Sequence, residues 1–515
     1  MFMKLKYLTS FILSLNDISF LLEPITYATL NRFVAIGLGS CKLSNFPDFL
    51  RNQDHLQVLD LSHNNIHGQI PKWVWNTSKE TLMYVNFSHN LLTGFDHHLF
   101  NFPWPRLKIL DLRSNKLHAL PPVPPPSILV YLVADNKLQG ETSPLICNLS
   151  SLYFFDLSNN KFGGMLPPCF SNFSNSLTIL NLRGNTFDGI IPQLCGEGST
   201  MKMIDLSQNQ FEGVLPRLLS NCQMLEFLNI GSNNLNDVFP SWLGTLPKLR
   251  VLILRHNGFY GVVGSPTTMF ASPNLRILDL STNKFTGKLP FKYFRNWMFM
   301  KKVDLDDFKY LWAFRFFKPC CHDSDDVYPY SMTIINKGRE TVYLKIIKVF
   351  AAIDLSRNEF NGMIPEFIGN LNGFQLLNLS NNNLTGHIPL SLGNLTTMEC
   401  LDISQNKLSG QIPWQLTHLT FLASSNVSHN QLPGPIPHGN QFDTFDNSSF
   451  DGNLGLCGNP LSKRCENPKP SPLPTSSIEE DQDSCIQFDW IIILMGYGSG
   501  LVIGVVIGNI VTEKK

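Results

Sequence analysis

The sequence predicts an α/β-type solenoid: one rod of stacked repeats with a parallel sheet on its concave side, followed by one C-terminal transmembrane helix. Three observations predict it. The line L-x-x-L-x-L-x-x-N-x-L-x-G-x-I-P recurs along the chain at a nearly constant period. A single stretch between two blocks of repeats interrupts it. Residues 490–512 carry no charged side chain and are long enough to cross a bilayer.

Composition excludes several classes of protein. The 515 residues would suggest three or four domains at about 150 residues each, but a repeat makes them one rod. Lysine plus arginine equals aspartate plus glutamate, 40 against 40, so no net charge would attract nucleic acid. Charged residues are 16% and hydrophobic residues 43%, which argues against disorder. The 11 cysteines form no C-x-x-C pair, so the usual zinc modules are excluded.

The repeat is anchored by an asparagine column. Successive positions are mostly 23 to 26 residues apart, with one step of 21 before Asn136. About twelve repeats fall in residues 1–290 and four in residues 350–437. The sixteen positions are Asn16, Cys41, Asn64, Asn90, Asn115, Asn136, Asn160, Asn185, Asn209, Asn233, Asn257, Asn283, Asn358, Asn382, Asn406 and Asn430.

Each column has a physical reason. Leucines two residues apart, such as Leu59 and Leu61, place both side chains on the inward face of a short strand. We expect each asparagine to bond the bend backbone of its own and the next repeat, because those buried groups would otherwise stay unsatisfied. Cys41 is a small buried substitute in that column. The G-x-I-P ending supplies a flexible turn residue and an extended convex segment.

These columns resemble the leucine-rich repeats of plant extracellular receptors, over about residues 7 to 437. The resemblance implies a right-handed superhelix. Residues 291–349 look like the island of plant receptor-like proteins, in which K-G-x-E-x-x-Y (Lys337 to Tyr343) precedes the last four repeats. We expect this island to overhang the concave face. Its Cys320–Asp326 cluster is interpreted as a solvated loop and not as a metal site, because no ligand spacing is recognisable.

The C-terminal side predicts a membrane anchor. Residues 438–466 resemble the cysteine-pair cap of these receptors, with Cys457 and Cys465 as its disulfide. An acidic, proline-rich juxtamembrane linker follows at 467–489, then the transmembrane helix at 490–512 and a short cytoplasmic tail at 513–515. Two lysines after the span place the repeats outside, as in a single-pass type I protein of the plasma membrane. Four glycines on one face of this helix indicate packing against another helix: Gly496, Gly500, Gly504 and Gly508.

The N-terminus admits two interpretations. Residues 4–13 have the basic start and apolar run of a signal peptide. However, Leu8, Phe11 and Leu13 fall into the repeat register, and Asn16 interrupts the apolar run, so we predict a repeat. On that interpretation the family's signal peptide and N-terminal cysteine cap would be absent, and the chain would be part of a longer receptor or the product of a shortened gene.

The concave face holds the candidate ligand-binding residues, since arginine and aromatic side chains are typical binding anchors. They are Arg113, Tyr153, Arg183, Arg250, Arg255 and His256. The alternative is that these side chains only keep an open sheet soluble. Candidate N-glycosylation sites, each in an N-x-S/T sequence, are Asn76, Asn148, Asn172, Asn383, Asn394 and Asn447. Asn86, Asn378 and Asn426 also lie in such sequences but are expected within strands, so we doubt them as acceptors.

No catalytic, cofactor-binding or metal-binding motif is recognisable, which predicts that the chain is not an enzyme. The resemblance is to plant disease-resistance receptors without a kinase domain. It implies a cell-surface receptor-like protein that recognises a pathogen-derived or developmental ligand, a protein or peptide, and signals by associating with a receptor-like kinase through the membrane helix. Two alternatives remain open: an extracellular inhibitor of cell-wall hydrolases, and a truncated, non-functional or decoy receptor.

Overall fold

The computed structural model describes residues 7–14, 32–96, 101–173, 175–264, 273–294, 300, 309–316 and 326–465. The chain divides into two units, 1–465 and 466–515, and only the first contains described residues. The predicted linker, membrane helix, tail and four helix-packing glycines therefore lie outside the described residues, as do Asn16 and Cys320–Asp325. Among the described residues, no helix combines the length and the apolar character needed to cross a membrane.

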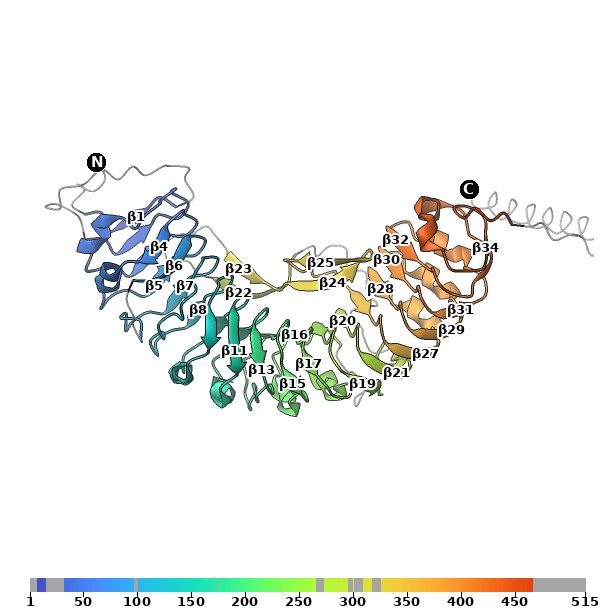
Figure 1. The fold of residues 1–515 in the computed structure, drawn as a ribbon, viewed down its shortest axis with the longest axis horizontal. Helices are drawn as coiled ribbons and strands as arrows, with labels where there is room; N and C mark the ends of the chain where they lie inside the picture. The colour runs from blue at the N-terminus through green and yellow to red at the C-terminus, as the bar shows by residue number, and fades with distance from the viewer. Residues whose placement is uncertain are drawn as a thin grey trace, which may run out of the picture. The chain divides into compact units, whose positions relative to one another are not determined.

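One parallel sheet runs through the whole first unit (Figure 1). Within the described residues it contains sixteen strands, one for each expected repeat, and neighbouring strands pair in register. In spatial order the strands are β1 (Ser10–Ile12), β2 (Ala35–Gly37), β3 (Val58–Asp60), β5 (Tyr84–Asn86), β7 (Ile109–Asp111), β8 (Val130–Leu132), β10 (Phe154–Asp156), β12 (Ile179–Asn181), β14 (Met203–Asp205), β16 (Phe227–Asn229), β18 (Val251–Ile253), β20 (Ile277–Asp279), β26 (Ala352–Asp354), β28 (Leu376–Asn378), β30 (Cys400–Asp402) and β32 (Ser424–Asn426). The predicted solenoid fold with a parallel sheet is confirmed.

The asparagine column joins each coil to the one before it. The Asn64 Nδ2 group donates to the carbonyl oxygens of Leu61, in its own coil, and Leu38, in the preceding coil, at 3.0 and 2.8 Å. Its Oδ1 accepts from the backbone N–H groups of Cys41 and Leu43, both at 2.9 Å. The expectation that the asparagine would reach the next repeat was therefore wrong in direction. The asparagine side chain lies at the end of the bend. Outside its own coil, the backbone N–H and C=O groups within its reach there belong to the preceding coil.

Cys41 stands at the asparagine position of its coil, and its thiol is a weaker hydrogen-bond donor than an asparagine amide. Its buried sulfur lies 3.6 Å from the carbonyl oxygens of Leu13 and Gly39, on the same side as the amide of an asparagine in other coils. Strand β1 precedes this coil, and its Phe11 pairs with Ile36 and is buried. Residues 7–14 thus form a coil of the solenoid, as the repeat register predicts.

The island, residues 291–349, interrupts the repeat in the sequence, but the parallel sheet continues across it. Strand β26 follows β20 directly, with Ile277 opposite Ala352. The asparagine bridge also continues, because Asn358 Nδ2 donates to the Leu280 carbonyl oxygen at 3.0 Å. In the core, the Phe285 ring stacks on Phe360 with centroids 6.2 Å apart. The four C-terminal repeats are therefore the continuation of one solenoid.

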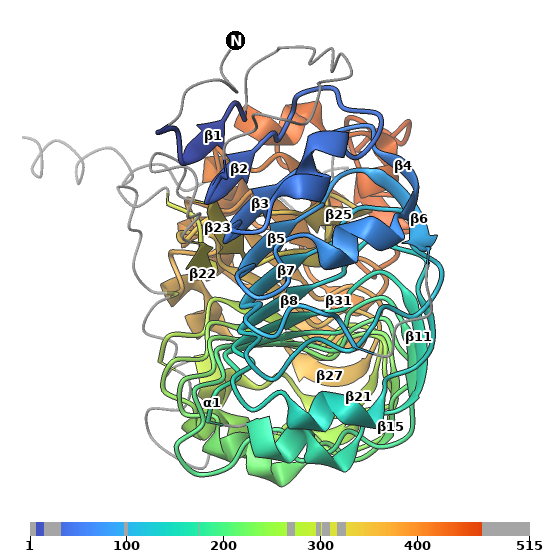
Figure 2. The ribbon, with the colours of Figure 1, turned by 90° about the vertical axis from the view of Figure 1, so that its left-hand side faces the viewer.

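A second set of strands lies along one edge of the coils, at a distance from β1, β2 and β3 (Figure 2). These strands follow the asparagine column and are β4 (His67–Ile70), β6 (Leu91–Phe95), β9 (Gln139–Glu141), β11 (Lys161–Met165), β13 (Thr186–Asp188), β15 (Glu212–Gly213), β17 (Asn234–Leu235), β19 (Tyr260–Val262), β21 (Lys284–Lys288), β27 (Glu359–Met363), β29 (Asn383–His387) and β31 (Lys407–Ser409). In most coils the glycine of the repeat ending takes a left-handed φ in this layer, for example +82° at Gly68.

Short helical turns close the coils on the convex side. Most begin after the proline of the repeat ending, whose φ is −66° at Pro71. They are η3 (Asp48–Asn52), η4 (Lys72–Asn76), η5 (Pro144–Asn148), η6 (Pro168–Phe173), η7 (Arg217–Asn221), η8 (Ser241–Thr245), η10 (Glu366–Asn370), η11 (Leu390–Asn394) and η12 (Trp414–His418), and α1 (Phe291–Phe294) follows the twelfth coil.

The C-terminal cap continues the ladder by one rung that the sequence analysis missed. Strands β33 (Pro433–Pro435) and β34 (Gly455–Cys457) pair, with turns η13 (Asn440–Thr444) and η14 (Asn447–Ser449) between them. Asn453 accepts from the Leu432 N–H at 3.1 Å and donates to the Val427 carbonyl oxygen at 3.0 Å. It lies 23 residues after Asn430, a spacing that could have revealed it. The cap also contains the Cys457–Cys465 disulfide, with Cα atoms 4.9 Å apart.

We expect Asn209→Ala to destabilise the solenoid by several kcal/mol. The change orphans the Phe187 N–H and the Leu182 carbonyl oxygen, which now bond the amide at 3.1 and 2.9 Å, at a cost of about 1–3 kcal/mol for each buried group. The measurement is urea unfolding of the full chain. Gln210→Ala, at an exposed position in the same coil, is the control and should change stability by less than about 0.5 kcal/mol. Equal midpoints for both variants would contradict the assignment.

Candidate functional site

The island packs against the concave face, where overhang had been expected. It consists of two hairpins, β22 (Trp312–Phe316) with β23 (Asp326–Pro329) and β24 (Met332–Asn336) with β25 (Arg339–Tyr343), which lie in the hollow of the first unit (Figure 1). One buried apolar cluster joins them to the sheet. Its sheet members include Val130, Phe154, Ile179, Met203, Phe227, Val251 and Ile277, and its island members are Leu311, Ala313, Tyr330, Met332, Ile334 and Ile346.

Two island tyrosines fix the position of the hairpins. The Tyr330 ring stacks on Phe227 of β16, with centroids 5.2 Å apart and an angle of 8° between the planes. Tyr328 meets Phe154 edge-on at 4.6 Å. Its hydroxyl donates to Asp156 Oδ2 at 3.0 Å and accepts from Asn181 Nδ2 at 2.8 Å. Tyr328 is therefore held on the sheet both by an aromatic contact and by two hydrogen bonds of its hydroxyl group.

Burial controls the protonation of this contact. It raises the pKa of the Asp156 carboxyl, although hydrogen bonds from Ser158, the charge of Arg113 and the Tyr328 hydroxyl oppose that shift. Burial and the neighbouring Asp156 carboxylate raise the pKa of Tyr328 well above its ordinary value. The phenol consequently keeps its proton and acts as a donor at every physiological pH.

Three of the six candidate binding residues contact the island. The Tyr153 ring lies 5.2 Å from that of Phe314. Arg183 Nη2 donates to Thr333 Oγ1 at 3.2 Å, and Arg255 forms an ion pair with Glu340, the glutamate of the K-G-x-E segment. These side chains contact the island in this structure, and their role in ligand binding stays a prediction.

The other three candidates differ in their surroundings. Arg250 lies 3.5 Å from Glu226 in an ion pair on the sheet. His256 is exposed in the turn one residue before Asn257, with φ of 53°. Arg113 is held by Asp111: its Nε and Nη2 atoms lie 3.0 and 2.7 Å from the two carboxylate oxygens. Arg113 also lines a hollow between the coils and the island.

That hollow, which we call the island pocket, has a volume of about 300 Å³ and lies between the early coils and one end of the island. Its walls carry both polar and apolar groups. From the coils come Ser62, His63, Tyr84, Asn86, Ser88, His89, Ile109, Asp111, Arg113 and Leu132, and from the island come Val327, Tyr328, Pro329, Ser331 and Leu344. Such a mixed, concave surface built from two elements is typical of a ligand site.

Two stacked histidines form part of the pocket wall. The His63 and His89 rings lie 4.1 Å apart, almost parallel at 11°, on consecutive coils. Both residues have a left-handed φ of 54° in the turn before the asparagine column. Burial, followed by the neighbouring His63 and Arg113, lowers the pKa of His89, while Asp111 and Asp135 oppose that shift. Neither histidine was predicted as a site residue, although their spacing of one repeat was an available signal.

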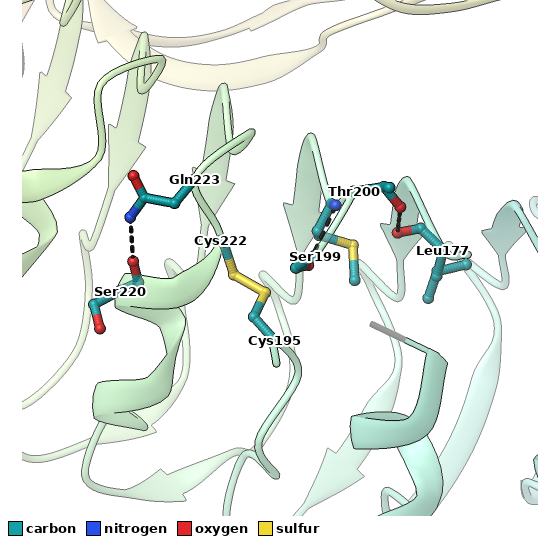
Figure 3. Close-up of a disulfide and its surroundings, with 8 residues drawn as sticks. Leu177, Cys195, Ser199, Thr200, Ser220, Cys222 and Gln223 are labelled. Atoms are coloured by element: carbon teal, nitrogen blue, oxygen red, sulfur yellow. Dashed lines mark hydrogen bonds between the residues drawn. A yellow bond between two sulfur atoms is a disulfide. The ribbon is translucent and has the colours of Figure 1, made fainter. Parts of the chain in front are cut away.

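Two disulfides also escaped the sequence analysis. Cys147–Cys169 and Cys195–Cys222 each join consecutive coils, with sequence separations of 22 and 27 residues. Figure 3 shows the second of these bonds beside the short helical turn that contains Ser220. Separations of about one repeat were the available signal. Such cross-links are typical of proteins from oxidising compartments.

The glycosylation candidates divide by exposure. Asn76, Asn148, Asn383, Asn394 and Asn447 are exposed, and nothing is described for the side chain of Asn172. Asn86 and Asn378 are buried, at 5% and 4% exposure, and each accepts a hydrogen bond from a serine of its own coil. These two are therefore poor acceptors, as their strand positions had suggested.

Comparison with known proteins gives the family. Leucine-rich-repeat models match residues 175–235, 199–259, 55–77, 151–173, 274–294, 374–395 and 397–419. Receptor-like protein 53 of Arabidopsis thaliana is 41% identical over 486 residues, which cover 93% of this chain and 46% of the relative. Receptor-like protein 6 of the same plant is 46% identical, over 93% of this chain and 47% of the relative. The chain is a plant leucine-rich-repeat receptor-like protein. It spans about half the length of these curated relatives.

Solved structures of plant receptor ectodomains are similar to this receptor-like protein. The ectodomain of the Arabidopsis thaliana receptor kinase GASSHO1/SCHENGEN3, in complex with CASPARIAN STRIP INTEGRITY FACTOR 2, has a TM-score of 0.63 at 26% identity, covering 85% of this chain and 50% of that one. The Arabidopsis receptor kinase HAESA, in complex with the peptide hormone IDA and the co-receptor SERK1, has a TM-score of 0.59 at 26% identity, covering 82% and 70%.

We expect Tyr328→Phe to loosen the island. Without the hydroxyl, the buried Asp156 carboxylate and the Asn181 amide each lose a partner, at about 1–3 kcal/mol each. Amide hydrogen exchange in residues 327–343 should accelerate several-fold relative to the last four repeats. Tyr310→Phe is the control, because its ring is 46% exposed. Unchanged exchange in the Tyr328 variant would show that this contact does not hold the island.

Proposed function

We propose that this chain is the ligand-recognising part of a cell-surface receptor-like protein, with its repeats outside the cell. The island pocket carries the proposal, because a concave pocket with both polar and apolar walls, built on a regular sheet, is the arrangement that recognises a specific partner. Supporting it, two similar ectodomains were solved with bound ligands, CASPARIAN STRIP INTEGRITY FACTOR 2 and the peptide hormone IDA. We infer that the ligand here is an extracellular peptide or protein, either pathogen-derived or developmental.

Two elements contribute to the pocket, and this gives ligand binding a way to act on the island. Asp111 and Arg113 belong to β7 and the turn after it, whereas Pro329 ends β23 of the island and Leu344 directly follows β25. A ligand that contacts both the coils and the island binds more tightly when the island is docked than when it is placed elsewhere. It therefore stabilises the docked island by the difference between these two binding free energies. The coupling needs no catalytic group in this chain.

The output would come from an associated receptor-like kinase. The predicted span has glycines at four-residue intervals on one helix face, which favours packing against another helix. HAESA was solved in complex with both the peptide hormone IDA and the co-receptor SERK1, so that receptor assembles with a second receptor protein. For this chain we propose that ligand binding favours assembly and that the membrane helix supplies part of the contact.

A bulky side chain in the pocket tests the recognition step. Leu344 is 74% exposed and lines the pocket, so Leu344→Trp should occlude it without disturbing the core. Val342→Trp, on β25 and 54% exposed, lies outside the pocket lining and is the matched control. Full chains in membranes are incubated with fractionated extracellular fluid, and retained peptides and proteins are identified by mass spectrometry. We expect one component to be lost from Leu344→Trp and kept by Val342→Trp; equal retention by all three chains would contradict the proposal.

A double substitution tests the membrane contact. Gly500→Leu with Gly504→Leu fills the small-residue face, so co-precipitation of the receptor-like kinase should be lost while ligand retention survives. The control pair is Val502→Leu with Val506→Leu, which enlarges the helix elsewhere. Co-precipitation that is unchanged by the glycine substitutions would refute the proposed route.

A further inference from the structure

The island pocket contains three groups that are or can become cationic, gathered at one wall. His63 and His89 are stacked at 4.1 Å, and the positive charge of Arg113 reaches His89 and lowers its pKa. The opposing charges are few. Asp111 is engaged with Arg113 at 2.7 Å, and Asp135, the other acid facing His89, is exposed and accepts from Asn159.

The charge of the wall therefore depends on the protonation of the histidines. When both imidazole rings are neutral, the charges of Arg113 and Asp111 cancel, so the described pocket lining has no net charge. Protonation of one ring makes it positive. In the empty pocket, burial and the neighbouring His63 and Arg113 lower the pKa of His89 and so disfavour its protonation. An anion placed against the rings would oppose that shift.

We propose that this wall is a proton-coupled subsite for the carboxylate of the ligand. The proposal rests on the proposed ligand-binding function and names the chemistry of one part of that ligand. A carboxylate beside the rings favours their charged form, and the hydrogen bonds between a charged imidazole and a carboxylate are stronger than neutral ones. The apolar side of the same pocket, with Ile109, Val327 and Leu344, accommodates a small aliphatic body attached to the carboxylate.

The sign of the pH dependence follows directly. The bound carboxylate raises the pKa of His89, so the complex binds more protons than the empty receptor. Affinity therefore increases as the pH falls from the bound pKa to the ligand-free pKa, by about ten-fold for each pH unit in that window when one proton is taken up. Below the ligand-free pKa the affinity levels off.

The repeat itself offers a variant that should fold normally. Gln208 and Gln405 occupy the column of His63 and His89 in other coils, with the same left-handed φ of 56° and 52°. His63→Gln with His89→Gln is thus compatible with the backbone and cannot be protonated. His429 lies in the same column, with φ of 53°, outside the pocket lining, so His429→Gln is the matched control.

Small probes test the subsite by NMR of the full chain with 13C-labelled histidine. N-acetyl-leucine carries a carboxylate and an aliphatic body, N-acetyl-leucinamide is its neutral counterpart, and the α-amide of N-acetyl-glutamate presents a side-chain carboxylate instead. We expect both carboxylates to shift the His63 and His89 signals, with an affinity at least ten-fold higher at pH 5.5 than at pH 7.5. The tighter of the two identifies the source as a chain terminus or an acidic side chain. The control variant should behave as the wild type does.

Three results would overturn the proposal: equal binding of the neutral amide, a pH-independent affinity, or full binding by the double glutamine variant. Failure here is distinguishable from failure of the receptor function. If the carboxylates do not bind while Leu344→Trp still removes a natural ligand, the pocket recognises that ligand through other chemistry.

Discussion

The bend that follows each concave strand is the constraint on which the rest of the structure depends. It leaves buried backbone N–H and C=O groups facing one another across consecutive coils, and one asparagine amide satisfies both kinds. Asn64 does so between the coils of β2 and β3, and Asn358 does so between β20 and β26, where the sequence is interrupted. Because the bridge fixes each coil to its predecessor, the concave side chains form straight columns. Those columns create the apolar surface that receives the island and the histidine stack beside it.

The island converts a periodic surface into a specific one. A sheet of repeated coils offers similar columns along its whole length, whereas the hairpins cover part of it and form the island pocket at one of their ends. Tyr328 and Tyr330 hold that placement through ring contacts with Phe154 and Phe227. The Arg255–Glu340 ion pair adds a polar contact at the other end of the hairpins, where Glu340 is 61% exposed and the pair alone is worth little. Specificity of placement comes mainly from the buried aromatic contacts.

Local features were predictable from sequence, and long-range ones were not. The period gave the strands, the coil at residues 7–14 and the continuation past the island, because each coil repeats the same local physics. It also carried the signals of Asn453 and of the disulfide pairs, which were overlooked. Arg113 stays a predicted binding residue. Arg183 and Arg255 contact residues 150 and 85 positions away, and no periodicity encodes those partners. The pocket arises from the same non-local docking, so its island residues could not be named in advance.

The central claim is that the island is docked on the concave sheet with Glu340 against Arg255. A zero-length cross-link tests it most directly. In an Arg255→Lys variant of the full chain, carbodiimide should join the new amine to the Glu340 carboxylate, and mass spectrometry of a digest should find peptides linked between positions 255 and 340. A link found there in good yield, and lost when Glu340→Gln is added, is the predicted result. If position 255 remains unlinked while Glu340 reacts with lysines elsewhere, the island does not lie where the account places it.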